Sequence, residues 1–227
     1  MYSTSRFSKV NRTEQVLPVR PTEPDDAAPR RLTDRKRIAI VQAAATEFQT
    51  RGYFSTSMNV IAATANVSKR TLYNHFDSKE ALFDAIIEEL AQKAELLPEC
   101  SFDPSRDLRE QLVELAEAEV QFMTSTSVVA LARAGISRVL AEPEVGKKID
   151  HRRFHKRVES WLDDALAAGC LNHTNTEFAA KQFVGMLMTF AFWPTIVNGE
   201  SPPSKKKRAS IIESTVEMFL SCYRVSD

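Results

Sequence analysis

Residues 57–83, SMNVIAATANVSKRTLYNHFDSKEALF, decide the fold class of this chain. Ser57 and Ser68 each precede a short run in which apolar residues recur at helical spacing, and serine is a favoured residue just before a helix. Only a tight turn separates the two runs. We therefore predict two short helices, at 57–64 and 68–75, that form a helix-turn-helix.

Helical periodicity continues on both sides of this motif. Upstream, Thr33 is expected to cap a helix that ends at Gly52, where a left-handed C-terminal cap suits glycine. Downstream, Ser78 is expected to begin a longer helix. No segment shows sustained two-residue alternation, so we predict an all-α protein of about nine helices. Beyond Pro98, amphipathic patterns separated by proline and glycine predict helices near 105–124, 126–141, 144–168, 176–198 and 204–223.

The composition agrees with a helical protein. Hydrophobic residues make up 43% of the 227 residues, which is enough for a sizeable core, and the 6 glycines and 10 prolines are few. The three cysteines are scattered without metal-ligand spacing, which argues against a disulfide framework or a zinc site. The longest apolar stretch, 183–197, is interrupted by Pro194 and falls short of the ~20 residues that span a bilayer. With no signal peptide recognisable, we expect a cytoplasmic protein without membrane association.

Charge divides the chain into three parts. Residues 1–29 hold four of the prolines and show no helical period, so we expect a disordered N-terminal tail. Residues 30–82 carry nine basic and four acidic residues, whereas residues 83–227 carry a net charge of −5 that brings the whole chain to zero. A basic helix-turn-helix segment is typical of a DNA-binding domain. We therefore predict an N-terminal three-helix DNA-binding domain at 30–82, joined to a C-terminal helical bundle at 83–227.

The DNA-binding segment resembles the tetracycline-repressor-like (TetR/AcrR) family of transcriptional regulators. The resemblance rests on Ala44-Ala45-x-x-Phe48-x-x-x-Gly52-Tyr53, on Thr56-Ser57-Met58-x-x-Ile61-Ala62 and on residues 67–83. Asn66 departs from the glycine that the family commonly has in the turn, and asparagine tolerates the left-handed backbone better than other non-glycine residues. The C-terminal half resembles the AefR-like regulatory domain, on Phe190-Ala191-Phe192-Trp193-Pro194, Gly199-Glu200-x-Pro202-Pro203 and Phe219-Leu220-x-x-Tyr223.

The candidate DNA contacts lie at the start of the second helix of the motif and around it. The Arg70 guanidinium can read guanine through two hydrogen bonds, and Ser57 can direct free helix amides at a phosphate. The resemblance implies phosphate contacts by Tyr73, His75 and Lys79. A packed tyrosine is the alternative for Tyr73, and a solvated basic face is the alternative at the start of the first helix. The candidates are Arg35, Arg37, Ser57, Ser68, Lys69, Arg70, Thr71, Tyr73, Asn74, His75 and Lys79.

Residues 83–227 are expected to bind an effector and to form a dimer. Aromatic and methionine residues at helical spacing either fill a core or line a cavity for a small apolar or amphipathic effector. His151 and His155 share one helix face at a spacing that suits a metal, but the cationic neighbours favour a solvated basic face, so no metal site is predicted. The resemblance implies a homodimer through the last two helices, 176–198 and 204–223. The candidate pocket residues are Phe122, Leu131, Arg133, Phe154, His155, Met186, Thr189, Phe190 and Trp193.

The leading hypothesis is a homodimeric repressor that binds a near-palindromic operator in double-stranded DNA and is released by an effector. The alternative is a DNA-binding protein whose C-terminal domain docks a protein partner. An enzyme is disfavoured because the sequence contains no GxSxG, P-loop, HExxH or dinucleotide-binding motif, and we expect no cofactor.

Overall fold

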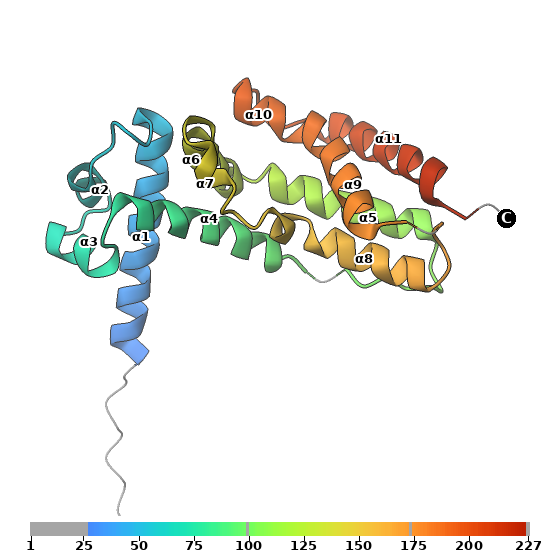
Figure 1. Ribbon diagram of the computed structural model, residues 1–227, viewed down its shortest axis with the longest axis horizontal. Helices are drawn as coiled ribbons and strands as arrows, with labels where there is room; N and C mark the ends of the chain where they lie inside the picture. The colour runs from blue at the N-terminus through green and yellow to red at the C-terminus, as the bar shows by residue number, and fades with distance from the viewer. Residues whose placement is uncertain (1–26, 99, 173, 226–227) are drawn as a thin grey trace, which may run out of the picture.

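The computed structural model describes residues 27–98, 100–172 and 174–225, with the backbone alone for residues 27–32. The predicted tail lies outside the described residues except for positions 27–29, which are helical. In the described part, eleven α-helices and a single 3-10 helix form an elongated molecule, which confirms the all-α class (Figure 1). The elements are α1 (Ala27–Arg51), α2 (Met58–Thr64), α3 (Lys69–His75), α4 (Lys79–Glu95), α5 (Leu108–Met123), α6 (Thr126–Ala141), α7 (Pro143–Gly146), η1 (His151–Phe154), α8 (Lys156–Ala167), α9 (Thr176–Ala191), α10 (Trp193–Val197) and α11 (Lys205–Tyr223).

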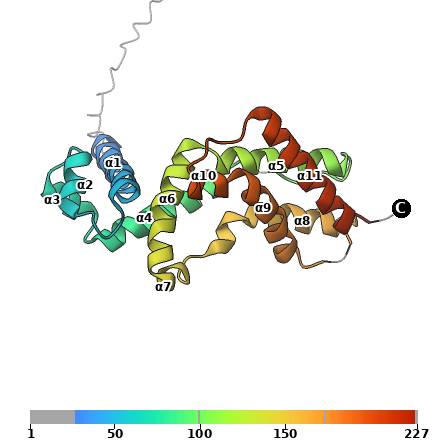
Figure 2. The ribbon, with the colours of Figure 1, turned by 90° about the horizontal axis from the view of Figure 1, so that it is seen from above.

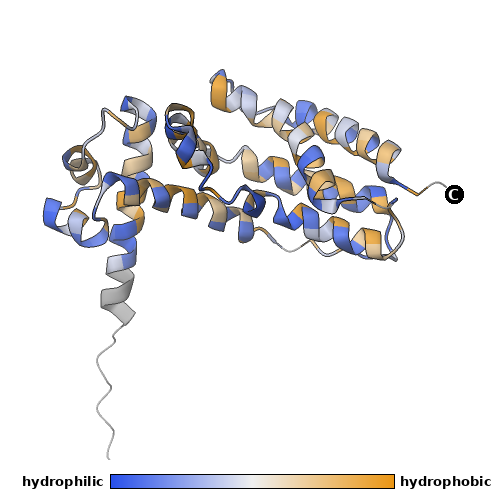
Figure 3. Cartoon of the chain, viewed as in Figure 1, coloured by the Kyte–Doolittle hydropathy of each residue, from blue (hydrophilic) through white to orange (hydrophobic). Residues whose placement is uncertain are grey.

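Helices α1, α2 and α3 form one end of the molecule, and α4 leads away from them into the rest (Figure 1). Their core is a buried cluster that includes Phe48, Ile61, Leu72 and Phe83. Leu131 and Ala134 of α6 belong to the same cluster, so α6 closes the core of this end of the molecule. Apolar residues follow α4 where it crosses the molecule, whereas α3 is largely hydrophilic (Figure 3).

The other end is a bundle of α5, α8, α9 and α11 around a second buried cluster, with α6 and α7 between the two ends (Figure 2). Trp161 and Phe183 are among the largest side chains of this cluster that are fully buried. Among the described residues, one isolated antiparallel bridge pairs Leu171 with Arg224. No described helix is both long and apolar enough to cross a membrane.

Local sequence signals set the helix starts around the motif, as predicted. The Oγ atoms of Ser68 and Ser78 accept hydrogen bonds from the amides of Thr71 and Ala81, at 3.0 and 3.1 Å. Ser57 caps α2 in the same way, at 3.4 Å. In the turn between α2 and α3, Asn66 has a φ of 53°, so asparagine adopts the left-handed conformation that was predicted for it.

The predicted start of the first helix is wrong. Helix α1 begins at Ala27, so Thr33 lies inside the helix and does not cap it. Pro29 falls in the first turn, where the amide that proline lacks would have no partner within the helix, so it does not end the helix there. The predicted end at Gly52 is confirmed, with a φ of 83°.

Two of the long helices predicted for the C-terminal half are broken. The segment 144–168 divides into α7, η1 and α8. The Asp150 carboxylate accepts a hydrogen bond from the Arg152 amide at 3.1 Å and starts η1, while the His151 ring bonds the Gly146 carbonyl at 3.1 Å. The segment 176–198 divides into α9 and α10 because Pro194 has no amide hydrogen to continue the hydrogen-bond ladder.

Candidate DNA-binding surface and ligand cavity

The start of α3 presents two exposed cations. Ser68 fixes this turn, because its Oγ accepts a hydrogen bond from the Thr71 amide at 3.0 Å and lies 2.9 Å from the Thr71 hydroxyl. Leu72 anchors the helix to the core and is fully buried. The side chains of Lys69 and Arg70 are exposed and form no hydrogen bond or ion pair with the described residues. The geometry therefore holds two unpaired cations on a rigid helix terminus.

The rest of α3 continues this surface. Tyr73 is 47% exposed and Asn74 is also exposed, whereas His75 is half-buried beside the buried Phe76. On α1, Arg35 is exposed, and the Arg37 guanidinium carbon lies 5.3 Å from the centre of the Phe76 ring. The α1 cation thus lies next to the C-terminal end of α3. The structure brings the candidate DNA contacts of α1 and α3 onto one end of the molecule.

Lys79 occupies a different position from the other candidates. Its ammonium group donates to the carbonyl groups of Tyr53, Phe54 and Thr56, at 2.8, 3.3 and 3.1 Å. It also lies 4.5 Å from the centre of the Tyr53 ring. An ammonium has three N–H donors, and all three are engaged. Lys79 therefore fixes the loop that leads into the Ser57 cap of α2, and its phosphate contact stays a prediction.

Glu47 is a structural residue of this region that the sequence analysis missed. Its side chain is buried on α1, where Oε1 accepts from the Thr64 hydroxyl of α2 at 2.7 Å and Oε2 accepts from Arg51 at 2.8 Å. It thereby ties α1 to α2 and fixes the motif on its supporting helix. The spacing of Glu47 and Arg51, four residues apart on a helix, was the available sequence signal.

A partly open cavity of about 430 Å³ lies in the C-terminal part, with walls from α4, α5, α6, η1, α9 and α10. Its size is in the range of small-molecule sites. Phe122, Phe154, His155 and Trp193, four of the nine candidate pocket residues, line it. Its remaining lining residues are Ile87, Leu90, Glu119, Met123, Val128, Ala132, Gly135, Ile136, Val139, Leu140, Ile149, His151, Val184, Met188 and Phe192.

The other five candidate pocket residues do not line this cavity. Leu131 is buried in the cluster of the end formed by α1, α2 and α3, and Arg133 donates to the Thr195 carbonyl at 2.5 Å. Met186 packs against the core of the bundle. Thr189 and Phe190 are exposed on α9. These residues were predicted from helical spacing alone. Which of them reach the cavity depends on how each helix is rotated about its axis in the bundle.

Three polar side chains, Glu119, His151 and His155, interrupt the apolar wall of the cavity. Glu119 is 3% exposed, and its Oε1 accepts from Nε and Nη2 of Arg157 at 3.1 and 2.7 Å. Burial raises the pKa of Glu119, and the Arg157 guanidinium partly offsets that rise. His155 is 9% exposed, and burial lowers the pKa of its imidazole. Its Nε2 atom is buried and has no hydrogen-bond partner among the described residues.

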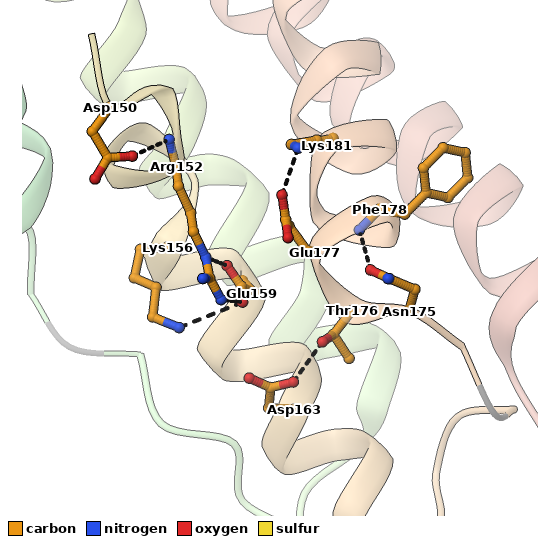
Figure 4. Close-up of polar contacts among 10 residues, drawn as sticks. All are labelled: Asp150, Arg152, Lys156, Glu159, Asp163, Asn175, Thr176, Glu177, Phe178 and Lys181. Carbon is orange, nitrogen blue, oxygen red and sulfur yellow. Dashed lines mark hydrogen bonds and ion pairs between the residues drawn. The ribbon is translucent and has the colours of Figure 1, made fainter. Parts of the chain in front are cut away.

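The charged side chains that act on His155 come from η1, α8 and α9. Figure 4 shows how these charged side chains pair with one another. Arg152 pairs with the buried Glu159, and Lys156 lies 3.5 Å from the same carboxylate. On α9, Lys181 pairs with Glu177 at 2.6 Å. The Thr176 hydroxyl donates to Asp163 at 2.6 Å, which ties the start of α9 to α8, and Asn175 caps α9 through the Phe178 amide at 2.9 Å. Among the described residues, no group of His, Cys, Asp and Glu side chains is placed to hold a metal ion.

Large apolar side chains are exposed along α9, α10 and α11. Phe190 is 56% exposed, Trp193 41% and Val197 71%, and they follow one another at helical spacing. On α11, Met218 is 58% exposed. These helices are the ones predicted to form the dimer.

An exposed basic helix in a helix-turn-helix, joined to a bundle with an internal apolar cavity, defines the class of helix-turn-helix DNA-binding regulators. Comparison with known proteins identifies the family. Residues 40–86 match the profile of bacterial regulatory proteins of the tetR family, and residues 110–225 match the C-terminal domain of the AefR-like transcriptional repressors. The chain therefore belongs to the TetR family and is a DNA-binding transcriptional regulator with an AefR-like C-terminal domain.

Individual relatives agree with this assignment. A TetR family transcriptional regulator from Pseudomonas syringae pv. tomato str. DC3000 has a similar crystal structure, with 37% identity, a TM-score of 0.76 and coverage of 86% of this chain and 100% of the other. The flavonoid-responsive regulator FrrA is similar at 28% identity and a TM-score of 0.66, over 86% of this chain and all of that chain. YhgD of Bacillus subtilis (strain 168), an uncharacterized HTH-type transcriptional regulator, is 28% identical over 83% of this chain and 97% of its own length. The family comprises transcriptional regulators, which confirms that the chain is not an enzyme.

Proposed function

We propose that this protein is a repressor that binds a near-palindromic operator as a homodimer in the cytoplasm and leaves it when a small molecule enters the cavity. The proposal rests on Lys69 and Arg70 at the start of α3, which Ser68 caps. Both side chains are exposed cations without an ion-pair partner among the described residues. A helix fits the major groove of DNA, about 12 Å wide, and an arginine there can bond guanine through two contacts. Two such helices in a dimer would read half-sites about 34 Å apart.

The homodimer rests on the exposed apolar face of α9, α10 and α11. An exposed patch of large apolar side chains is costly in water and marks an interaction surface. Phe190, Val197 and Met218 have most to gain from such cover, because more than half of each is exposed. A second copy of the chain would cover the face with its own α9 and α11, which gives the symmetric pair that a near-palindromic operator requires.

Release by an effector rests on the two faces of α6. Val128, Ala132 and Ile136 line the cavity, whereas Leu131 and Ala134 pack into the core of the end formed by α1, α2 and α3. A ligand that binds more tightly to one position of α6 shifts the population toward that position and moves the DNA-binding end with it. The relative FrrA is described as flavonoid-responsive, which supports a small aromatic effector for this fold.

The test is binding of the full-length protein to a labelled duplex from the region upstream of its own gene, measured by fluorescence anisotropy and footprinting. We expect footprinting to protect a near-palindrome and the complex to contain one dimer per site. The logarithm of the association constant should fall linearly with the logarithm of the salt concentration, with a slope that corresponds to the release of several counterions. Binding with the same affinity to a scrambled duplex would contradict it. If a co-purifying protein, and no small molecule, releases the chain from the operator, the result would favour the alternative of a docked partner protein.

A further inference from the structure

His155 is an unsatisfied polar group in the wall of the cavity. Its side chain is nine-tenths buried, at 9% exposed, and its Nε2 atom has no hydrogen-bond partner among the described residues. Buried polar atoms are paired in most proteins, since an unpaired one costs about 1–3 kcal/mol. The other histidine of the cavity, His151, is different, because its Nε2 atom lies 3.1 Å from the Gly146 carbonyl oxygen. His155 thus lacks the partner that His151 has.

The charges around His155 are already paired, and this limits what its partner can be. Glu119, in the same wall, is held by Arg157 at 2.7 Å. Arg152 is paired with Glu159, and Lys181 with Glu177. A carboxylate ligand would therefore meet the Glu119 carboxylate with no free cation to compensate it. An ammonium ligand would lose its hydration in an apolar cavity whose one carboxylate is already bound.

The remaining wall favours a flat aromatic ligand. The rings of Phe122, Phe154, Phe192 and Trp193 line the cavity together with aliphatic side chains. Aromatic rings pack on one another in offset or edge-to-face arrangements, which contribute beyond the area that they bury. A bare hydrocarbon would fill the cavity but would leave Nε2 of His155 unpaired.

We propose that the ligand of this cavity is an uncharged aromatic compound with one hydroxyl group, a phenol, whose hydroxyl pairs with Nε2 of His155. A hydroxyl both donates and accepts, so it satisfies this atom in either tautomer of the neutral ring, whereas a carbonyl satisfies only one. The inference rests on the proposed function for its cavity, and it adds the chemical class of the ligand.

Three compounds with one biphenyl scaffold test the inference on the full-length protein: 4-phenylphenol, biphenyl and biphenyl-4-carboxylate. Equilibrium dialysis should give 4-phenylphenol an affinity about tenfold above that of biphenyl, the value of one hydrogen bond to an otherwise unpaired group. The carboxylate should bind more weakly than both. His155→Phe should abolish the preference, so that 4-phenylphenol binds no more tightly than biphenyl, with circular dichroism showing a folded chain.

The matched control is His151→Phe, which removes a histidine of the same cavity whose Nε2 is already bonded. It should preserve the preference for the hydroxyl compound. The inference is overturned if none of the three compounds binds, if the carboxylate binds best, or if His155→Phe keeps the hydroxyl preference. The affinity for DNA, measured in the same preparations with and without 4-phenylphenol, separates the two proposals. If 4-phenylphenol binds with the expected preference but does not change the DNA affinity, the ligand class is supported and only the release step of the proposed function is ruled out.

Discussion

The guanidinium of Arg138 on α6 stacks on Tyr53, which lies between α1 and α2, with its carbon 4.3 Å from the centre of the tyrosine ring. The same carbon lies 4.5 Å from the Phe83 ring of α4. Arg138 is 7% exposed, and the Tyr53 hydroxyl donates to Glu80 at 2.9 Å. One buried cation therefore joins α6, whose neighbouring residues line the cavity, to the loop before the helix-turn-helix.

Replacing Arg138 by methionine should weaken this junction. The variant keeps much of the side-chain length but loses the cation–aromatic contacts, each of which contributes about 1–2 kcal/mol when desolvated. We expect a loss of about 2 kcal/mol in the free energy of unfolding, measured in urea. We also expect a cavity ligand to change the DNA affinity of the variant less than it changes the DNA affinity of the wild type. Arg224→Met, at an exposed position after α11, is the control. Unchanged stability in Arg138→Met would show that the stacking contributes nothing.

Replacing Lys79 by methionine separates its two possible roles. If the ammonium fixes the loop through the carbonyl groups of Tyr53, Phe54 and Thr56, the variant should lose about 1–2 kcal/mol of stability without DNA present. If Lys79 acts only on a phosphate, the melting temperature should stay constant. The salt dependence of DNA binding should then correspond to about one released counterion fewer. Thermal unfolding and a salt titration of DNA binding decide between these outcomes. We expect the loss of stability.

Acid should weaken the tie between α4 and η1. Two hydrogen bonds from Arg153, at 2.6 and 3.1 Å, lower the pKa of Glu88 from 4.5 to about 2. Because the pKa is lower in the folded state than in the unfolded state, the stabilisation is complete above pH 4.5 and declines as the pH falls toward 2.

The variant Glu88→Gln measures this contribution. Its side chain is 44% exposed, so solvent screening limits the effect to about 0.5 kcal/mol. The difference in unfolding free energy between wild type and variant should be present at pH 6 and should shrink by pH 3.5. Glu217→Gln, at an exposed position of α11, is the control. If the stability difference grows as the pH falls, the ionised Glu88 carboxylate does not stabilise the folded state.

A charge in the exposed apolar face should separate the proposed dimer. Phe190→Glu places a carboxylate where the proposed interface would bury it, at a cost of several kcal/mol. Sedimentation velocity should show a monomer at concentrations where the wild type is a dimer, and operator binding should weaken strongly. Leu96→Glu, at an apolar position that is 83% exposed after α4, should leave the dimer intact. A dimeric Phe190→Glu variant would rule out this face as the interface.

Local signals were sufficient to predict much of the DNA-binding end. The serine caps and the turn at Asn66 depend on hydrogen bonds between neighbouring residues, so the sequence alone predicts them. The start of α1 was missed because Pro29 is tolerated in a first turn, and the break after α9 was missed although Pro194 is a recognised helix breaker.

The cavity could be predicted only in part. Phe190 and Phe192 are two residues apart, yet Phe192 lines the cavity and Phe190 is exposed, because the helix ends between them and its rotation is set by packing. The Glu119–Arg157 pair joins residues 38 positions apart, and no local pattern marks it. Helical spacing identifies amphipathic faces, but the partner of each face is decided by the tertiary fold.

Replacing Arg70 by alanine shows whether α3 reads the bases of the operator. The measurement is fluorescence anisotropy on the footprinted operator and on a random duplex of equal length, across a salt series. We expect a loss of about 1–3 kcal/mol on the operator with a much smaller loss on random DNA, so that the specificity ratio falls. Equal losses on the two duplexes, or no loss on the operator, would contradict base reading by α3.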